Sequence, residues 1–150
     1  MTDIISQQLV VFSLGREEYA LPIASVHEII RFTEPRTVAS DAEWIRGVIG
    51  LRGKIIPIFD LASRMGVAAS GSEPGKIVIV ESGTGQVGVM VDEVEEVLTV
   101  TSDQLEPVRS AASDAIEAIE AIAKIEDRLV ILLNPVGLFA RSGADDLAAA

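Results

Sequence analysis

Short runs of aliphatic residues, bounded by glycine and acidic turns, dominate the pattern of hydrophobic and polar positions along this chain. Residues 9–12 and 77–80 are the clearest runs, and their β-branched composition predicts strands. Asp60 precedes residues 61–65 and Gly66 follows them, which predicts a short helix with Asp60 as its N-cap and Gly66 as its stop. We therefore expect a mainly β protein with a few short helices.

The second half of the chain repeats the pattern of the first half. With an offset of 68 (77 − 9), residues 9–29 align with residues 77–97. With an offset of 74 (121 − 47), residues 47–60 align with residues 121–134. Apolar positions meet apolar positions in both blocks, although few residues are identical. Because both blocks occur in the same order, we interpret them as an internal repeat.

The repeat predicts two similar β units within one domain. The first covers about residues 8–66 and the second about residues 76–134, with turn-forming residues 67–75 as the linker between them. A closing helix over about 135–141 and a polar, alanine-rich tail complete residues 135–150. The first 75 residues hold 7 basic and 9 acidic residues (net −2), and the remainder holds 5 and 14 (net −9). Such a difference suits two faces with different partners.

The alignment also predicts turns and resolves one ambiguous segment. Arg52 and Gly53 align with two acidic residues 74 positions later, and both pairs are expected at hairpin turns. Residues 114–123 carry isoleucines at helical spacing, but the repeat favours a strand, so we expect at most a short helix before Ala121. Trp44 follows a polar stretch and is expected to anchor the connecting loop on the core, with a groove-lining role as the alternative.

Composition and charge exclude several classes of function. The chain has no cysteine, one histidine (His27) and a net charge of −11. It therefore has no disulfide framework, thiolate metal site, cysteine nucleophile or zinc site built on paired histidines. The negative charge disfavours nucleic acid and anionic membranes as partners. No signal peptide is evident and no apolar run approaches the roughly 20 residues of a membrane span, so we expect a soluble cytoplasmic protein without direct membrane insertion.

Residues 83–88 fit the glycine pattern of a dinucleotide-binding loop, with Asp103 located 20 residues after Gly83. That function needs a helix to begin in the loop, so that its N-terminus faces the pyrophosphate. The following residues alternate as a strand does, and a hairpin turn is the simpler interpretation. The acidic cluster at residues 92–96 is interpreted as a solvated face, and no catalytic motif is recognised. A nucleotide-binding enzyme therefore stays as the weaker alternative.

Residues 45–61 resemble the signature of the CheW family of bacterial chemotaxis coupling proteins. That signature runs roughly G-V-x-N-L-R-G-x-I-x-P-I-x-D-L, and it matches at Gly47, Val48, Leu51, Arg52, Gly53, Ile55, Pro57, Ile58, Asp60 and Leu61. Further similar stretches extend the resemblance to about residues 8–139. Two positions depart from the family: Gly50 replaces a usual asparagine, and Ala62 replaces a frequent arginine.

The resemblance implies two five-stranded SH3-like β-barrel subdomains with short helices. It implies a non-catalytic adaptor, without cofactor or metal, that couples the cytoplasmic tips of methyl-accepting chemoreceptors to the regulatory domain of the histidine kinase CheA. Such an adaptor is cytoplasmic and is recruited to membrane-associated receptor arrays. An adaptor of a non-flagellar chemosensory system, controlling pili or development, is the alternative.

The resemblance also implies binding residues. The expected receptor-binding residues are Val26, Glu28, Ile29 and Val97. The expected kinase-binding residues are Arg52 and Gly53. Val26 and Glu28 are expected to share one strand face, so that an apolar contact and an acidic rim are presented together to a helical hairpin. Beside a turn glycine, Arg52 can project its guanidinium towards an acceptor across an interface.

Structural roles remain open for four of these six positions. Val26 and Val97 are equally compatible with core packing, Glu28 with a solvated strand charge, and Arg52 with bracing its own hairpin. Pro57 predicts an edge or irregular strand, because proline cannot donate a hydrogen bond to a ladder.

Overall fold

The computed structural model describes residues 6–38, 44–67, 75–83, 85–107 and 118–139. These residues form a mainly β structure, as expected. The strands are β1 (Ser6–Leu14), β2 (Glu17–Pro22), β3 (Val26–Arg31), β4 (Ile45–Leu51), β5 (Lys54–Phe59), β6 (Lys76–Glu81), β7 (Gln86–Val91), β8 (Glu93–Thr101), β9 (Leu105–Pro107), β10 (Ile119–Ile125) and β11 (Arg128–Leu133). The helices are α1 (Leu61–Met65) and α3 (Pro135–Phe139), with short 3₁₀ turns at Ile23–Ser25 and Ser102–Gln104.

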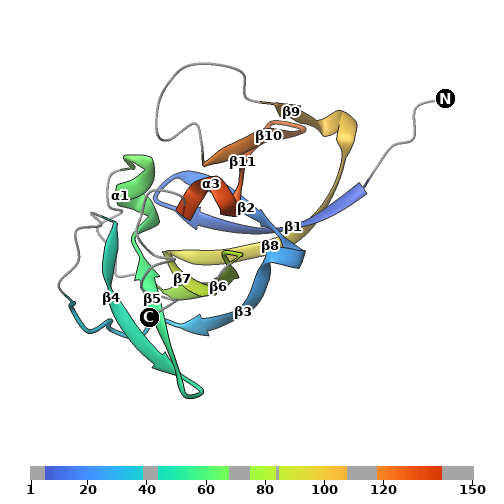
Figure 1. Cartoon of the computed structure of the whole chain (residues 1–150). Coiled ribbons are helices and arrows are strands. Elements are labelled where there is room, and N and C mark those ends of the chain that lie inside the picture. Colours follow the sequence, from blue (N-terminus) through green and yellow to red (C-terminus); the bar gives the residue numbers. More distant parts are fainter. Residues whose placement is uncertain (1–5, 39–43, 68–74, 84, 108–117, 140–150) are drawn as a thin grey trace.

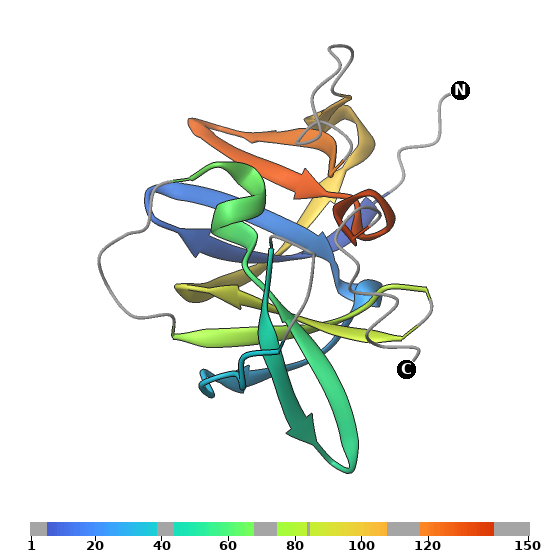
Figure 2. The ribbon, with the colours of Figure 1, turned by 60° about the vertical axis from the view of Figure 1, so that its left-hand side comes forward.

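The strands form two sheets (Figures 1 and 2). One has six strands in the order β8-β1-β2-β11-β10-β9, and the other has five in the order β3-β6-β7-β5-β4. Neighbouring strands are antiparallel except in the pairs β2–β11 and β5–β7, which are parallel. The number of sheets agrees with the two SH3-like units expected, and the three-residue β9 extends one sheet to six strands.

Each sheet contains strands from both halves of the chain. β1 and β2 join β8 to β11 in the six-stranded sheet, whereas β6 and β7 join β3 to β5 in the five-stranded sheet. In Figure 2 the blue strands of the N-terminal hairpin accordingly lie beside the orange strands near the C-terminus. The linker expected at 67–75 thus separates the two repeats along the sequence but not the two sheets. Neither sheet corresponds to residues 8–66 or 76–134 alone.

This exchange is symmetric, because equivalent residues of the two repeats pair in the same register. Ile29 of β3 lies opposite Val78 of β6, and Val97 of β8, 68 positions later, lies opposite Val10 of β1. The register shift near His27 in the first pair of strands recurs at the equivalent place in the second. The alignment of the two halves therefore describes an approximate twofold relation in space.

The two hairpins β4–β5 and β10–β11 are also equivalent. Arg52 (φ 50°) and Glu126 (φ 56°) begin their turns in the left-handed region, 74 positions apart. Both expected turns are confirmed. The strand expected from Ala121 onward is confirmed as β10, and residues 114–117 of the ambiguous segment lie outside the described residues.

Short helices follow each hairpin and start with the same device. The carboxylate of Asp60 accepts a hydrogen bond from the Ser63 N–H at 3.2 Å, and Gly66 ends α1 in the left-handed conformation, as predicted. The amide oxygen of Asn134 accepts from the Val136 N–H at 3.1 Å at the start of α3. The helix expected at 135–141 is confirmed for residues 135–139. The described part of the chain contains no helix capable of spanning a bilayer.

Four strands in the middle of the molecule, β1, β2, β6 and β7, are buried on both faces. On β6, Val78 and Val80 pack into a core shared by the two sheets. Ile77 and Ile79 point to the other face and pack in a second core within the five-stranded sheet. β1 likewise contributes to the shared core and to the inner side of the six-stranded sheet. Burial on both faces explains why residues 9–12 and 77–80 are unbroken apolar runs without alternation.

Trp44 and Arg64 lie at one border of the shared core. The partly buried Trp44 ring packs on that core, with its centroid 6.4 Å from that of Phe59. The buried Arg64 guanidinium lies 4.8 Å from the Trp44 centroid, a cation–π contact. These contacts are those of the expected anchor.

Pro57 does not lie in an edge strand, since β5 is placed between β7 and β4. It lies opposite Val48, whose N–H and C=O bond to Arg36 on the other side of β4 at 2.9 and 2.8 Å. The β4–β5 ladder therefore needs no N–H from Pro57, and the proline fits a central strand without losing a hydrogen bond to β4.

Candidate functional site

Strand β3 carries three of the four expected receptor-binding residues and forms an edge of the five-stranded sheet. A bulge at His27 shifts its register, so that Val26 lies opposite Val80 and Glu28 lies opposite Ile79. Residues directly opposite each other in a sheet share a face, so Val26 and Glu28 point to opposite faces. The expectation that they share a face is therefore wrong, because the bulge inserts one residue between them.

The aliphatic members of this set divide into packed and exposed residues. Val26 is half-buried and packs against the shared core. Ile29 and Val97 are 41% and 52% exposed, at equivalent positions on the edge strands β3 and β8. Val26 thus has a structural role, whereas Ile29 and Val97 leave apolar surface accessible to a partner.

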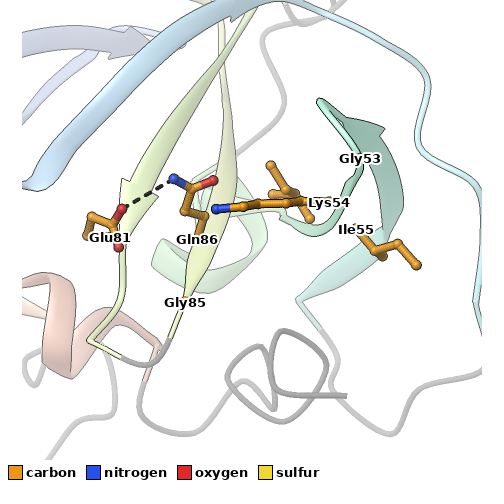
Figure 3. A pocket seen from close by; sticks show the side chains of 7 residues that line it. Gly53, Lys54, Ile55, Glu81, Gly85 and Gln86 are labelled. Carbon is orange, nitrogen blue, oxygen red and sulfur yellow. Dashed lines mark hydrogen bonds between the residues drawn. The ribbon is translucent and has the colours of Figure 1, made fainter.

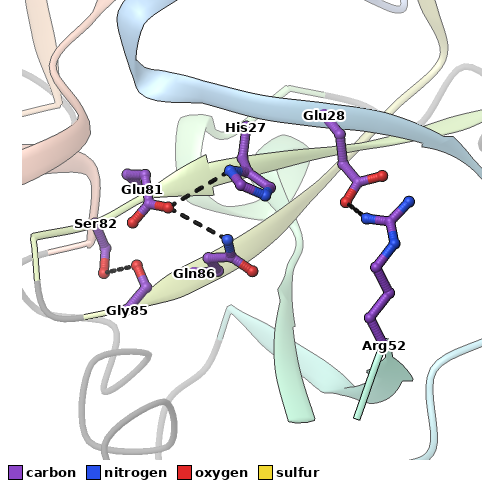
Figure 4. Close-up of polar contacts among 7 residues, drawn as sticks. All are labelled: His27, Glu28, Arg52, Glu81, Ser82, Gly85 and Gln86. Carbon is purple, nitrogen blue, oxygen red and sulfur yellow. Dashed lines mark hydrogen bonds and ion pairs between the residues drawn. The ribbon is translucent and has the colours of Figure 1, made fainter. Parts of the chain in front are cut away.

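Arg52 and Gly53 form the turn of the β4–β5 hairpin, as expected, with φ of 50° and 79°. The Arg52 guanidinium donates a hydrogen bond to the carboxylate of Glu28 (Figure 4). The Arg52 side chain is 69% exposed and that of Glu28 is 21% exposed. The structure therefore joins one residue expected to bind the receptor to one expected to bind the kinase.

A groove beside this ion pair lies between the β4–β5 turn and the β6–β7 turn. Its volume is about 490 Å³, and Lys54, Ile55 and Gln86 are among the residues that line it. A smaller cavity of about 60 Å³ shares Lys54 and Gln86 and reaches Glu28 and Arg52. Figure 3 shows the Lys54 side chain extending across the groove towards Gln86.

The opposite wall of the groove is polar. The Gln86 side-chain amide donates to the Glu81 carboxylate at 3.3 Å, and His27 Nδ1 lies 3.8 Å from the same oxygen (Figure 4). Sequence reasoning did not select His27, Lys54, Glu81 or Gln86 as site residues. No sequence signal selects them: Lys54 and Gln86 align with Arg128 and Glu18, but the ion pair that these two form in the six-stranded sheet is visible only in the structure.

The glycine-rich loop at residues 83–88 has the hairpin role that the alternation predicted. The strand β7 begins at Gln86, within the glycine pattern itself, so no helix begins there to face a pyrophosphate. The Ser82 N–H donates to the Gly85 carbonyl at 2.8 Å and closes the β6–β7 turn. Across the described ranges, no cluster of three or more His, Asp or Glu side chains is arranged to hold a metal ion.

Comparison with known proteins agrees with this architecture. The model of a CheW-like domain matches residues 8–143. The chain is 30% identical over 141 residues to the probable chemotaxis protein CheW of Rhizobium etli, which covers 93% of this chain and 91% of that protein. It is 35% identical over 104 residues to the chemotaxis protein CheW of Klebsiella aerogenes, which covers 69% of this chain and 63% of that protein.

A solved structure extends the agreement to the fold. The crystal structure of the scaffolding protein TtCheW from Thermoanaerobacter tengcongensis superimposes with a TM-score of 0.84 and 35% sequence identity, over 94% of this chain and 97% of that chain. Sequence and fold therefore agree with those of CheW-like domains over nearly the whole chain. The chain belongs to the CheW-like family, as residues 45–61 indicated.

Proposed function

We propose that this chain is a non-catalytic adaptor that couples the cytoplasmic tips of methyl-accepting chemoreceptors to the regulatory domain of a CheA-type histidine kinase. In this proposal the protein is cytoplasmic and joins receptor arrays at the membrane through its partners. The Glu28–Arg52 ion pair carries the proposal, because it connects the edge strand β3 to the exposed turn of the β4–β5 hairpin. In this proposal, a partner that draws Arg52 or Glu28 out of the pair changes the contact that the other residue offers to the second partner.

The receptor surface is proposed to comprise Ile29 and Val97, with Val26 supporting it from the core and Glu28 at its border. A receptor tip is a helical hairpin, and an exposed aliphatic residue on an edge strand can pack against an apolar face of such a hairpin. The kinase surface is proposed to be the turn at Arg52 and Gly53. A guanidinium at an exposed turn can donate several hydrogen bonds to a partner's carboxylate or carbonyls.

Reconstitution with receptor fragments and the kinase tests this assignment. We expect Arg52→Asp to reduce kinase activation and Glu28→Lys to weaken receptor binding, measured by phosphorylation and by calorimetry. Thermal unfolding should change little, because exposed ion pairs contribute about 0.2–1 kcal/mol and Asp tolerates a positive φ. Wild-type activation by Arg52→Asp would remove Arg52 from the kinase surface, and unchanged receptor affinity would remove Glu28.

A charge exchange separates the ion pair from outward contacts. The double variant Glu28→Arg with Arg52→Glu keeps an ion pair between β3 and the hairpin. If the pair acts only as a brace, the double variant should recover activity that each single variant loses. If Arg52 itself contacts the kinase, activation should stay low. Lys124→Met, which removes an exposed cation from β10 in the other sheet, is the matched control.

A further inference from the structure

The approximate twofold relation lets the groove beside Lys54 be compared with its counterpart in the other sheet. In that counterpart Arg128 stands at the first position of β11, as Lys54 does in β5. Arg128 Nε and Nη2 donate to the two carboxylate oxygens of Glu18 at 3.1 and 2.8 Å, and its Nη1 lies 3.0 Å from Glu96. Hydrogen bonding to Glu18 raises the pKa of Arg128, with a smaller contribution from Glu96. The cation is thus enclosed by two carboxylates of its own chain.

The equivalent position beside Lys54 lacks such an enclosure. Gln86 occupies the place of Glu18, and Glu28, which occupies the place of Glu96, is bound by Arg52. Within the described residues the side-chain ammonium of Lys54 makes no ion pair or hydrogen bond. The registers on which this comparison depends are equal, since Ile58 of β5 pairs with Gly88 of β7 as Leu132 of β11 pairs with Ala20 of β2.

We propose that the groove beside Lys54 receives the carboxylate of an Asp or Glu side chain from the regulatory domain of the partner kinase. This inference rests on the proposed function, because the groove continues from the turn at Arg52 and Gly53 that is assigned to the kinase. The incoming carboxylate takes the place that Glu18 occupies beside Arg128. The ion pair proposed between Lys54 and the kinase is thus the intermolecular counterpart of the Arg128–Glu18 pair within the six-stranded sheet.

The chemistry of the groove selects a protein side chain over other anions. Glu81 lines the groove and Glu28 lines the smaller cavity beside it, so a dianionic phosphate would meet more repulsion there than a single carboxylate does. Ile55, next to Lys54, is 69% exposed and provides an apolar contact at the groove's rim. A charged contact flanked by an exposed aliphatic residue is typical of a protein interface.

Two variants test the groove in the full-length chain, with the purified regulatory domain of the kinase as the probe in calorimetric titrations. Lys54→Met keeps the aliphatic stem and removes the charge. Gln86→Glu introduces a carboxylate at the position equivalent to Glu18. This carboxylate then forms an ion pair with Lys54 within the chain. We expect each variant to weaken kinase binding by about fivefold to tenfold at low salt, and to lose part of the salt dependence of the wild type. Lys124→Met should bind as the wild type does.

The outcomes separate this inference from the function on which it rests. If the wild type binds the kinase domain and both variants bind equally well, the carboxylate site is wrong and the adaptor function stands. If the wild type does not bind the kinase domain, both the carboxylate site and the adaptor function are wrong. Affinity for the receptor fragment should be unchanged in both variants, and a parallel loss of receptor binding would overturn the assignment to the kinase. Both positions border solvent, and thermal unfolding verifies that the variants remain folded.

Discussion

Tyr19 is the single tyrosine of the chain and lies in the shared core, where 2% of it is exposed. Burial raises the pKa of its phenol above the usual 10, and the charge of Glu17 adds to this shift. A pKa raised in the folded state means that stability is fully present below the unfolded pKa, near 10, and is lost as pH rises through the folded pKa. We therefore expect the free energy of unfolding to fall at alkaline pH.

The phenolate absorbance reports this one group. Its titration midpoint should lie above 10 in the folded protein and return to about 10 in urea. Tyr19→Phe should remove the part of the alkaline destabilisation that arises from this residue, because no phenol is left to ionise. A midpoint at or below 10 in the folded protein would contradict the prediction.

Gly50 occupies an open position of β4, opposite Ile55. A Cβ added there would meet no atom within 4 Å, and a glycine inside a strand costs about 0.5–1 kcal/mol relative to a residue with a side chain. Gly50→Thr should therefore raise the free energy of unfolding by about that amount, measured in urea. The contrasting control is Gly47→Ala, whose Cβ would lie 2.1 Å from the Arg36 carbonyl oxygen and should destabilise the fold by more than about 2 kcal/mol.

One residue shows where sequence reasoning about the site fails. The period of two along β3 placed Val26 and Glu28 on the same face, and the bulge at His27 reverses this. No glycine marks the bulge, and the equivalent bulge residue in β8 is Glu95. A bulge formed by ordinary residues is fixed by the pairing with the neighbouring strand, which a single sequence does not reveal.

At the scale of elements, the two helix caps give a matched pair of predictions. Asp60 caps α1 through the Ser63 N–H and also accepts from the Ser63 hydroxyl at 3.0 Å. Asp60→Ala should lower the free energy of unfolding by about 1 kcal/mol, and Asn134→Ala at the start of α3 by about 0.5–1 kcal/mol. Asp60→Asn keeps a side-chain acceptor for the cap and should recover most of the loss. Chemical denaturation measures all three, and an unchanged Asp60→Ala would show that the cap is dispensable.

Elements with local chemical signals were the ones that the sequence predicted well. A capping carboxylate, a stop glycine and a turn beside Arg52 each act within a few residues, so α1 and both hairpins could be located. Pro57 was expected in an edge or irregular strand and lies in a central one, because the relevant fact is non-local: Val48 directs its hydrogen bonds to Arg36 and not to β5. The lack of a carboxylate partner for Lys54 is also a non-local feature. It can be recognised only because the structure shows that Glu18 and Arg128 form an ion pair at the equivalent position.

At the scale of the whole molecule, the repeat was predictable and the exchange of strands was not. Aligned hydrophobic patterns identify equivalent strands, but they do not say which copy of β1–β2 pairs with which copy of β10–β11. That choice depends on burying both faces of the two hairpins β1–β2 and β6–β7 together in one shared core. An arrangement of two separate barrels would satisfy the same pattern along the sequence.

The exchange predicts that the two halves depend on each other for folding. A fragment of residues 1–72 contains β3, β4 and β5 without their neighbours β6 and β7, and a fragment of residues 73–150 lacks β1 and β2. Each fragment alone would leave strands with two apolar faces in water, so neither should unfold cooperatively.

Mixed in equal amounts, the two fragments should restore near-ultraviolet circular dichroism and one cooperative transition. The Arg128→Met variant should weaken this complementation, because Arg128 in one fragment binds Glu18 in the other. Cooperative unfolding of the first fragment as a monomer would show that the sheets form independently, and the shared core would then be a docking surface and not a folding requirement.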